Sequence, residues 1–341
     1  MALILGFDIG TTSTIGILID TDAGTLALAD RPVDLHAPKP GWAEQDPEQW
    51  WDNVRALVPA LLAEAGVDAG DIAAIGVSGM VPALILLDAD GRPVRRSIQQ
   101  SDGRTGHEVE AIRRETDEAA FLARCGNGIN QQLLAPKLRW LRAHEPEALA
   151  NARWVMGSYD FIAHRLTGKA TVEKNWALEA GFLDLGTDAV AADLVALGRI
   201  DAARLPPVRA GHEVVGEVVA TAAAATGLRA GTPVVAGAAD HVASAFVAGV
   251  QAPGDLLIKF GGAGDVLLAT AEPRPDARLF LDFHLVPGLY LPNGCMVTSG
   301  SLLNWFVRTI GTGAPVAPDG TPHAALDRLA AATPPGAEGL V

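Results

Sequence analysis

The sequence predicts an α/β protein of two domains, and three observations carry this prediction. Its 341 residues fit two domains of about 100–200 residues, and a 49% hydrophobic content suffices for sizeable cores. Short apolar strand patterns alternate with amphipathic helix patterns. A strand, a glycine-containing loop and a second strand open the chain, and the pattern recurs around residue 262. We expect related domains over 1–212 and 213–341, with the break near Gly211–Gly216.

The first domain begins with a predicted hairpin. Leu3–Phe7 and Ile15–Ile19 are aliphatic runs joined by a polar, glycine-containing loop. Asp46 and Pro47 then supply an N-cap and a first helical residue, and Gly66 ends that helix. The other elements expected in this domain are strands over Ile72–Val77 and Ala83–Leu87, and helices around 105–124, 135–143 and 158–166.

The second domain is predicted to begin near Val214. Its expected elements are a strand over Thr232–Ala236, a helix over His241–Val250, and strands over Asp255–Phe260 and Val266–Ala269. Leu340-Val341 resembles the start of another strand, where domains seldom stop. We therefore expect an incomplete second domain.

Composition excludes several classes of protein. With 26 Lys and Arg against 40 Asp and Glu, the net charge of −14 argues against nucleic acid or an anionic membrane as partner. Cys125 and Cys295 match no metal or redox spacing, which is typical of reduced thiols in a cytoplasmic protein. Prolines interrupt the charge-free stretch Leu285–Val307, and the amino terminus has no basic region, so neither a membrane helix nor a signal peptide is expected. The P-loop and Rossmann fingerprints do not occur.

The loop of the first hairpin can bind an anion. Gly10, Thr11, Thr12 and Ser13 offer successive backbone amides and three hydroxyls, a composition suited to cradling phosphate oxygens. Asp8, at the end of the preceding strand, can hold Mg²⁺ directly or through water. The alternative is an ordinary polar hairpin turn.

Two further carboxylates can act on a substrate. Asp240 stands between an apolar strand and a helix, where it can accept a proton from a hydroxyl or simply cap the helix. His241 beside it is a positioning or core residue rather than a metal ligand. Asp102 and Arg104 can hold a polyol through hydrogen bonds, although a surface Asp-Gly turn with an exposed arginine fits equally well.

Several short motifs follow one another along nearly the whole chain. They are Asp8-Ile9-Gly10-Thr11-Thr12-Ser13, Gly41-Trp42-Ala43-Glu44-Gln45-Asp46-Pro47-Glu48-Gln49-Trp50-Trp51, Asp102-Gly103-Arg104, Ala135-Pro136-Lys137-Leu138, Tyr159-Asp160-Phe161 with Leu166-Thr167-Gly168, and Ala236-Gly237-Ala238-Ala239-Asp240. Each motif alone is weak, but in this order they resemble the FGGY family of carbohydrate kinases, and within it most closely the xylulokinases.

The resemblance implies an actin-like ATPase fold, two ribonuclease H-like domains with mixed sheets, and phosphorylation of a sugar or polyol by ATP with Mg²⁺. Asp240 matches the general base, and Asp8 matches the aspartate near Mg²⁺, which it would hold through water. The resemblance also assigns the other site residues. Phosphate binding falls to Gly10, Thr11, Thr12, Ser13, Gly261, Gly262 and Gly264, and sugar binding to Met80, Val81, Pro82, Asp102, Arg104, Asp240 and His241.

The chain departs from the family pattern in two places. Met80-Val81-Pro82-Ala83 replaces a Gln-Met-His-Gly segment that touches the sugar, so a ketopentose such as D-xylulose is the leading expectation rather than a fixed one. Gly261-Gly262-Ala263-Gly264 replaces a Gly-Thr-Ser loop and keeps only its backbone contacts. Two alternatives stay open: an inactive remnant of a sugar kinase, and an actin-like nucleotide-binding protein. Association with another chain, such as a homodimer, is also expected.

Overall fold

The computed structural model describes residues 2–260, 264–296, 299–310 and 322–339. By packing, the chain divides into two compact units, one of Met1–Asp255 with Leu268–Pro292 and one of Leu256–Leu267 with Asn293–Val341. The first unit extends past residue 212, because the strands that follow it join the amino-terminal sheet. These units are defined by packing alone, so the predicted boundary between an N-terminal and a C-terminal kinase domain at residues 212 and 213 stays a prediction.

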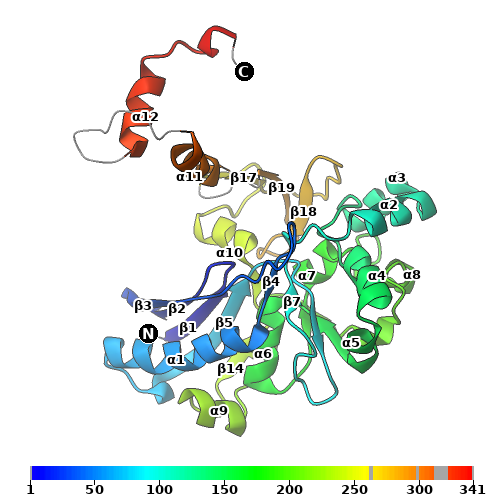
Figure 1. Ribbon diagram of the computed structural model, residues 1–341. Helices are drawn as coiled ribbons and strands as arrows, with labels where there is room; N and C mark the ends of the chain where they lie inside the picture. Colours follow the sequence, from blue (N-terminus) through cyan, green and yellow to red (C-terminus); the bar gives the residue numbers. More distant parts are fainter. Residues whose placement is uncertain (1, 261–263, 297–298, 311–321, 340–341) are drawn as a thin grey trace. The chain divides into compact units, whose positions relative to one another are not determined.

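A mixed sheet forms the centre of the first unit (Figure 1). The strand β5 (Ile72–Gly79) lies between β1 (Leu3–Ile9), which runs parallel to it, and the parallel segments β14 (Pro233–Val235) and β15 (Ala238–Ala239). Antiparallel strands extend both sides, β2 (Ser13–Asp20) and β3 (Gly24–Pro32) beyond β1, and β13 (Val214–Glu217) beyond β14. The predicted hairpin and the strand over 72–77 are confirmed.

Helices cover one face of this sheet. The predicted first helix, α1 (Pro47–Ala65), is confirmed with both of its caps: Asp46 accepts a hydrogen bond from the backbone N–H of Glu48, and Gly66 takes a left-handed φ of 65°. α1 packs on β2 and β3 and contacts α6 (Ser158–Thr167) and α9 (Ala220–Thr226), so the three lie together along the sheet (Figure 1).

The register of the first hairpin gives the sheet two different faces. Leu5 pairs with Leu18 and Phe7 pairs with Gly16, and a side chain added at Gly16 would meet Leu61 of α1 at 2.8 Å. This face is therefore the helix-covered core. Because side chains alternate along a strand, the intervening residues point to the opposite face, and that face carries Asp8.

The remaining elements complete the first unit. Its other helices are α2 (Gly106–Glu115), α3 (Glu118–Cys125), α4 (Leu134–His144), α5 (Pro146–Asn151), α7 (Lys174–Glu179), α8 (Ala192–Ala196) and α10 (Asp240–Val247), with 3₁₀ turns η1 (Ala69–Asp71) and η2 (Ala202–Arg204). Its short strands are β4 (Glu44–Gln45), β6 (Ile85–Leu87), β7 (Ser97–Ile98), β8 (Trp154–Met156), β9 (Val172–Glu173), β10 (Leu183–Asp184), β11 (Ala189–Val190), β12 (Val208–Arg209) and β18 (Phe280–Phe283). The helix predicted around 105–124 is divided into α2 and α3 by Thr116 and Asp117, both in extended conformation.

The second unit contains strands and two helices. Gly264–Leu268 (β17) lies between Leu256–Phe260 (β16) and Tyr290–Met296 (β19), and in this unit Gly264 pairs with Met296. The strands predicted over 255–260 and 266–269 are thereby confirmed. The helices are α11 (Gly300–Thr309) and α12 (Pro322–Ala331), followed by the 3₁₀ turn η4 (Ala337–Gly339). The strand expected at Leu340-Val341 lies outside the described residues.

Within the part of the chain that the structure describes, no helix is long and apolar enough to cross a membrane.

Candidate active site

The topology brings Asp8 and Asp240 to the same edge of the sheet. Asp8 pairs with Ser78 of β5 on one side, and Ala239 pairs with Gly79 of β5 on the other. Asp240 follows Ala239 directly. Because β1, β5 and β15 are parallel, their carboxyl ends meet at one edge, which is where α/β sheets bind ligands.

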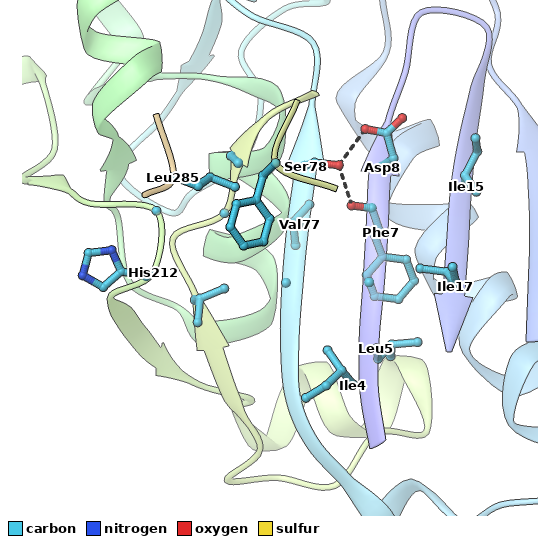
Figure 2. Close-up of a pocket in the computed structure, with 17 residues that line it drawn as sticks. Ile4, Leu5, Phe7, Asp8, Ile15, Ile17, Val77, Ser78, His212 and Leu285 are labelled. Atoms are coloured by element: carbon cyan, nitrogen blue, oxygen red, sulfur yellow. Dashed lines mark hydrogen bonds between the residues drawn. The ribbon is translucent and has the colours of Figure 1, made fainter. Parts of the chain in front are cut away.

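Asp8 is held in place by its neighbour on β5. The hydroxyl of Ser78 donates to Oδ1 of Asp8 over 2.8 Å (Figure 2). Asp8 and Ser78 lie at one end of a cavity of about 450 Å³, which Ile4 and Leu5 line at the other end in this view. Sequence reasoning missed Ser78, because a serine within a strand pattern carries no signal of its own.

The predicted phosphate loop is the tip of the β1–β2 hairpin. Its backbone closes through Gly10, whose N–H donates to the carbonyl of Ser13 over 3.0 Å. Thr11 and Thr12 are exposed, and the side chain of Gln45 donates to the carbonyl of Thr11 over 2.7 Å. The loop is thus tied to the segment after it, with two hydroxyl side chains open to a ligand.

Asp240 is the first residue of α10, and the prediction that it caps this helix is wrong. The cap position is Ala239, and no side chain caps the helix. Instead, Oδ1 of Asp240 accepts from the backbone N–H of His241 over 2.6 Å. The Asp240 side chain is 43% exposed, so its carboxylate is accessible to a substrate.

His241 lies in a cluster of acidic side chains. Its Nε2 is 2.9 Å from Oδ2 of Asp282 and 3.8 Å from Oε1 of Glu179, and its Nδ1 is 3.3 Å from Oδ1 of Asp240. Burial lowers the pKa of His241, but the charge of Asp282 and hydrogen bonds with Asp240 and Asp282 outweigh burial and hold this pKa well above its ordinary value. Sequence reasoning missed Glu179 and Asp282, which only the tertiary fold brings to His241.

Among the described residues, this cluster also offers a candidate metal site. One potential ligand atom from each of Glu179, His241 and Asp282 lies within 4.8 Å of the others. Nε2 of His241 lies at hydrogen-bond distance from Oδ2 of Asp282, and a ring nitrogen that donates there has no lone pair for a metal. We therefore interpret the cluster as an ion-pair network.

Asp102 and Arg104 form a buried ion pair in the loop after β7. Asp102 is fully buried, and its carboxylate accepts from Nε and Nη2 of Arg104 and from the backbone of Ala43. The guanidinium also contacts Glu44 at 2.8 Å and stacks on Trp42 at 3.7 Å. The surface-turn alternative is wrong, since the Arg104 side chain is only 1% exposed.

One nitrogen of the Arg104 guanidinium takes no part in this ion pair. Nη1 of Arg104 is buried and has no hydrogen-bond partner in the described part of the chain. Burial lowers the pKa of Lys137 to about 7, and the charges of Asp102, Arg104 and Glu179 also act on this pKa.

The other predicted site residues fall in different places. Met80, Val81 and Pro82 are buried directly after β5, where the N–H of Met80 donates to the carbonyl of Ile9. Gly264 begins β17 in the second compact unit, and Gly261 and Gly262 lie outside the described residues.

Comparison with known proteins identifies the family of the chain. The model of the FGGY family of carbohydrate kinases, N-terminal domain, matches residues 3–247. The chain is 33% identical over 322 residues to the L-xylulose/3-keto-L-gulonate kinase of Escherichia coli, covering 90% of this chain and 62% of that protein. It is 27% identical over 310 residues to the xylulose kinase of Escherichia coli, covering 90% of this chain and 63% of that protein. The chain thus spans less than two thirds of these relatives.

A solved structure is similar over almost the whole chain. The xylulose kinase from Rhodospirillum rubrum matches with a TM-score of 0.92 and 53% identity, over 99% of this chain and 69% of that one. The predicted actin-like ATPase fold with mixed sheets is thereby confirmed. The ordered motifs, the sheet edge with its two carboxylates and these matches lead to one conclusion: the chain belongs to the FGGY family of carbohydrate kinases.

Proposed function

We propose that this chain, alone or as part of a longer protein, transfers the γ-phosphoryl group of ATP to a hydroxyl of a sugar or polyol. The observation that carries the proposal is the placement of Asp8 and Asp240 on either side of β5 at one sheet edge. A proton acceptor and a group suited to Mg²⁺ at one edge are what phosphoryl transfer to a hydroxyl requires.

Asp240 acts as the general base. It accepts the hydroxyl proton as that oxygen forms a bond to the γ-phosphorus, and the bond from this phosphorus to the β-γ bridging oxygen breaks, releasing ADP. The partly exposed carboxylate and its attachment to the first turn of α10 support this role. The hairpin loop from Gly10 to Ser13 binds phosphate oxygens through its amides and hydroxyls.

Asp8 fits a magnesium ion. Mg²⁺ prefers hard oxygen ligands, and the hydrogen bond from Ser78 fixes the orientation of the Asp8 carboxylate. When bound there, Mg²⁺ would neutralise charge on the phosphates. Asp8 itself would hold the ion directly or through water.

A ketopentose such as D-xylulose is the proposed substrate. Several relatives are named xylulose kinases, and the unpartnered Nη1 of Arg104 is a buried donor suited to a sugar hydroxyl. The cytoplasmic location, the homodimer and the sugar contacts of Met80, Val81 and Pro82 stay predictions.

The test is release of ADP from ATP and Mg²⁺ with a panel of ketoses and polyols. Asp240→Asn is expected to lower turnover by about 10²–10⁴ while sugar binding, measured by calorimetry, is retained. Asp117→Asn is the matched control, since Asp117 caps α3 and asparagine caps equally well. Wild-type turnover in Asp240→Asn would remove Asp240 from this role. Sugar binding without turnover in the unmodified chain would favour the inactive remnant of a sugar kinase. ATP binding that does not depend on a sugar would favour the actin-like nucleotide-binding protein.

A further inference from the structure

His241 is hydrogen-bonded at both ring nitrogens by carboxylates. Nδ1 is 3.3 Å from Oδ1 of Asp240 and Nε2 is 2.9 Å from Oδ2 of Asp282. A neutral imidazole has one N–H and one lone pair, so it can donate to only one of these acceptors. Two ionised carboxylates, one at each nitrogen, both receive a hydrogen bond only when both nitrogens carry hydrogen. The contacts at Nδ1 and Nε2 therefore favour an imidazolium ion.

Two buried carboxyl groups hold the Nε2 side of the His241 ring. Asp282 on β18 is fully buried, and Glu179 at the end of α7 has a side chain only 7% exposed. Oδ1 of Asp282 and Oε1 of Glu179 accept no hydrogen bond from the residues that the structure describes, and the two carboxyl groups act on each other. A buried carboxylate without compensation is costly, and His241 supplies the compensating charge. Burial, followed by the charge of Asp282, holds the pKa of Glu179 well above its ordinary value.

The outer side of the imidazolium faces the proposed base. Oδ1 of Asp240 receives two donors from His241, the backbone N–H over 2.6 Å and Nδ1 over 3.3 Å. Two donors to one oxygen restrict the orientation of the whole carboxylate. The His241 side chain is 13% exposed against 43% for Asp240, so the imidazolium lies behind the base, on its protein side.

We propose that His241 is a positioning residue: a permanent imidazolium, anchored by Asp282 and Glu179, that orients Asp240 and keeps it ionised for proton transfer. The inference rests on the proposed function and adds to it the group that prepares the base. It also differs from the prediction that His241 binds the sugar, because a sugar contact affects substrate binding, whereas a positioning residue affects the chemical step.

Other titratable groups face the cluster from further elements. Glu173 on β9 acts on Asp282, and Lys137 on α4 acts on Glu179. Burial moves the pKa of each to about 7, so both titrate within the range of a kinetic assay. The pH profile of a His241 variant must therefore be compared with that of the unmodified chain.

The kinetic test uses His241→Asn in the full 341-residue chain with the best sugar of the panel. We expect kcat at pH 7 to fall about tenfold, KM for the sugar to change less than threefold, and the acid limb of kcat to move up by about one pH unit. His164→Asn is the matched control: His164 is also a mostly buried histidine, and Nδ1 of its ring has no hydrogen-bond partner among the residues with described positions. A raised KM with unchanged kcat and pH profile would overturn the inference in favour of a direct sugar contact.

A second test needs no turnover. Nitrogen NMR shifts of the His241 ring, assigned by their loss in His241→Asn, are expected to show an imidazolium at pH 7. Asp240→Asn and Asp282→Asn are each expected to move the titration of this ring toward lower pH. A neutral ring at pH 7, or a titration unchanged in Asp240→Asn, would overturn the inference.

The two tests separate the two proposals. If no sugar supports turnover, the proposed function fails, while the NMR titration still decides whether His241 couples to Asp240. If Asp282→Asn does not fold because of its buried position, Asp240→Asn carries the NMR test alone, since Asp240 is partly exposed.

Discussion

Gly237 fixes the segment that carries Asp240, and replacing it by alanine tests this placement. The residue has a φ of 94°, and a Cβ atom there would lie 2.0 Å from the carbonyl oxygen of Val77 on β5. Cβ atoms in proteins essentially never come closer than 3.0 Å to such an atom. The chain at Gly237 must therefore move by about 1 Å or more, and it carries β15 with it.

The cost has two parts. A left-handed φ costs an alanine about 1 kcal/mol. Movement away from Val77 also weakens the hydrogen bond from the N–H of Gly237 to the carbonyl of Gly211 and the pairing of Ala238 with Ser78, at about 1 kcal/mol each. We expect a total loss of about 3 kcal/mol, which at about 2–4 °C per kcal/mol lowers Tm by roughly 6–12 °C.

Gly254→Ala is the matched control. Gly254 has a φ of 96° in the same compact unit, and nothing lies within 4 Å of a Cβ atom added there. This variant carries only the backbone cost, so its Tm should fall by roughly 2–4 °C. Calorimetric melting of the two variants beside the unmodified chain is the assay. Equal Tm losses in the two would refute the claim that Val77 packs against Gly237.

Three shorter predictions follow from other buried groups. Burial raises the pKa of Glu173 to about 7, so the folded state holds this proton more tightly than the unfolded state. Stability should fall by about 3 kcal/mol as pH rises from about 4.5 to 7, and urea unfolding should show a smaller fall in Glu173→Gln. Burial raises the pKa of Cys125 to about 12, so alkylation at pH 8 should modify exposed Cys295 first, and equal rates would contradict the fold around Cys125. Arg104→Lys loses the paired hydrogen bonds to Asp102 and should raise KM for the sugar about tenfold or more, while an unchanged KM would exclude Arg104 from the sugar site.

Local signals in the sequence predicted the local structure well. Asp46, Pro47 and Gly66 marked both ends of α1, because caps act within one helical turn. The same local view failed at Asp240, since a cap residue and a first helical residue look alike in sequence. It also did not place β13, β14 and β15 in the amino-terminal sheet, because strand pairing over such distances leaves no local pattern.

The family resemblance located the proposed base but not what surrounds it. Glu179, Asp282 and Ser78 lie in segments that no motif covers, and each contacts a predicted residue only through the tertiary fold. Their residue types also gave no signal, since acidic residues and serines in helices and strands are usually solvent-exposed and a sequence does not show which of them are buried. Positioning groups of this kind are therefore accessible from structure rather than from sequence.

Under the proposed function, the burial of Asp102 and Arg104 determines how their loop would bind a sugar. A surface loop would offer both side chains to the ligand, at the cost of ordering them on binding. Here the Asp102 carboxylate is engaged by Arg104 and by the backbone of Ala43, and the guanidinium is fixed between Glu44 and the ring of Trp42. Under the proposed function, Asp102 would orient Arg104, and Nη1, which has no partner among the described residues, would make the contact. Because this donor is already ordered and desolvated, a hydroxyl placed against it gains a hydrogen bond without that ordering cost, whereas a ligand lacking the hydroxyl leaves a buried charged donor unsatisfied.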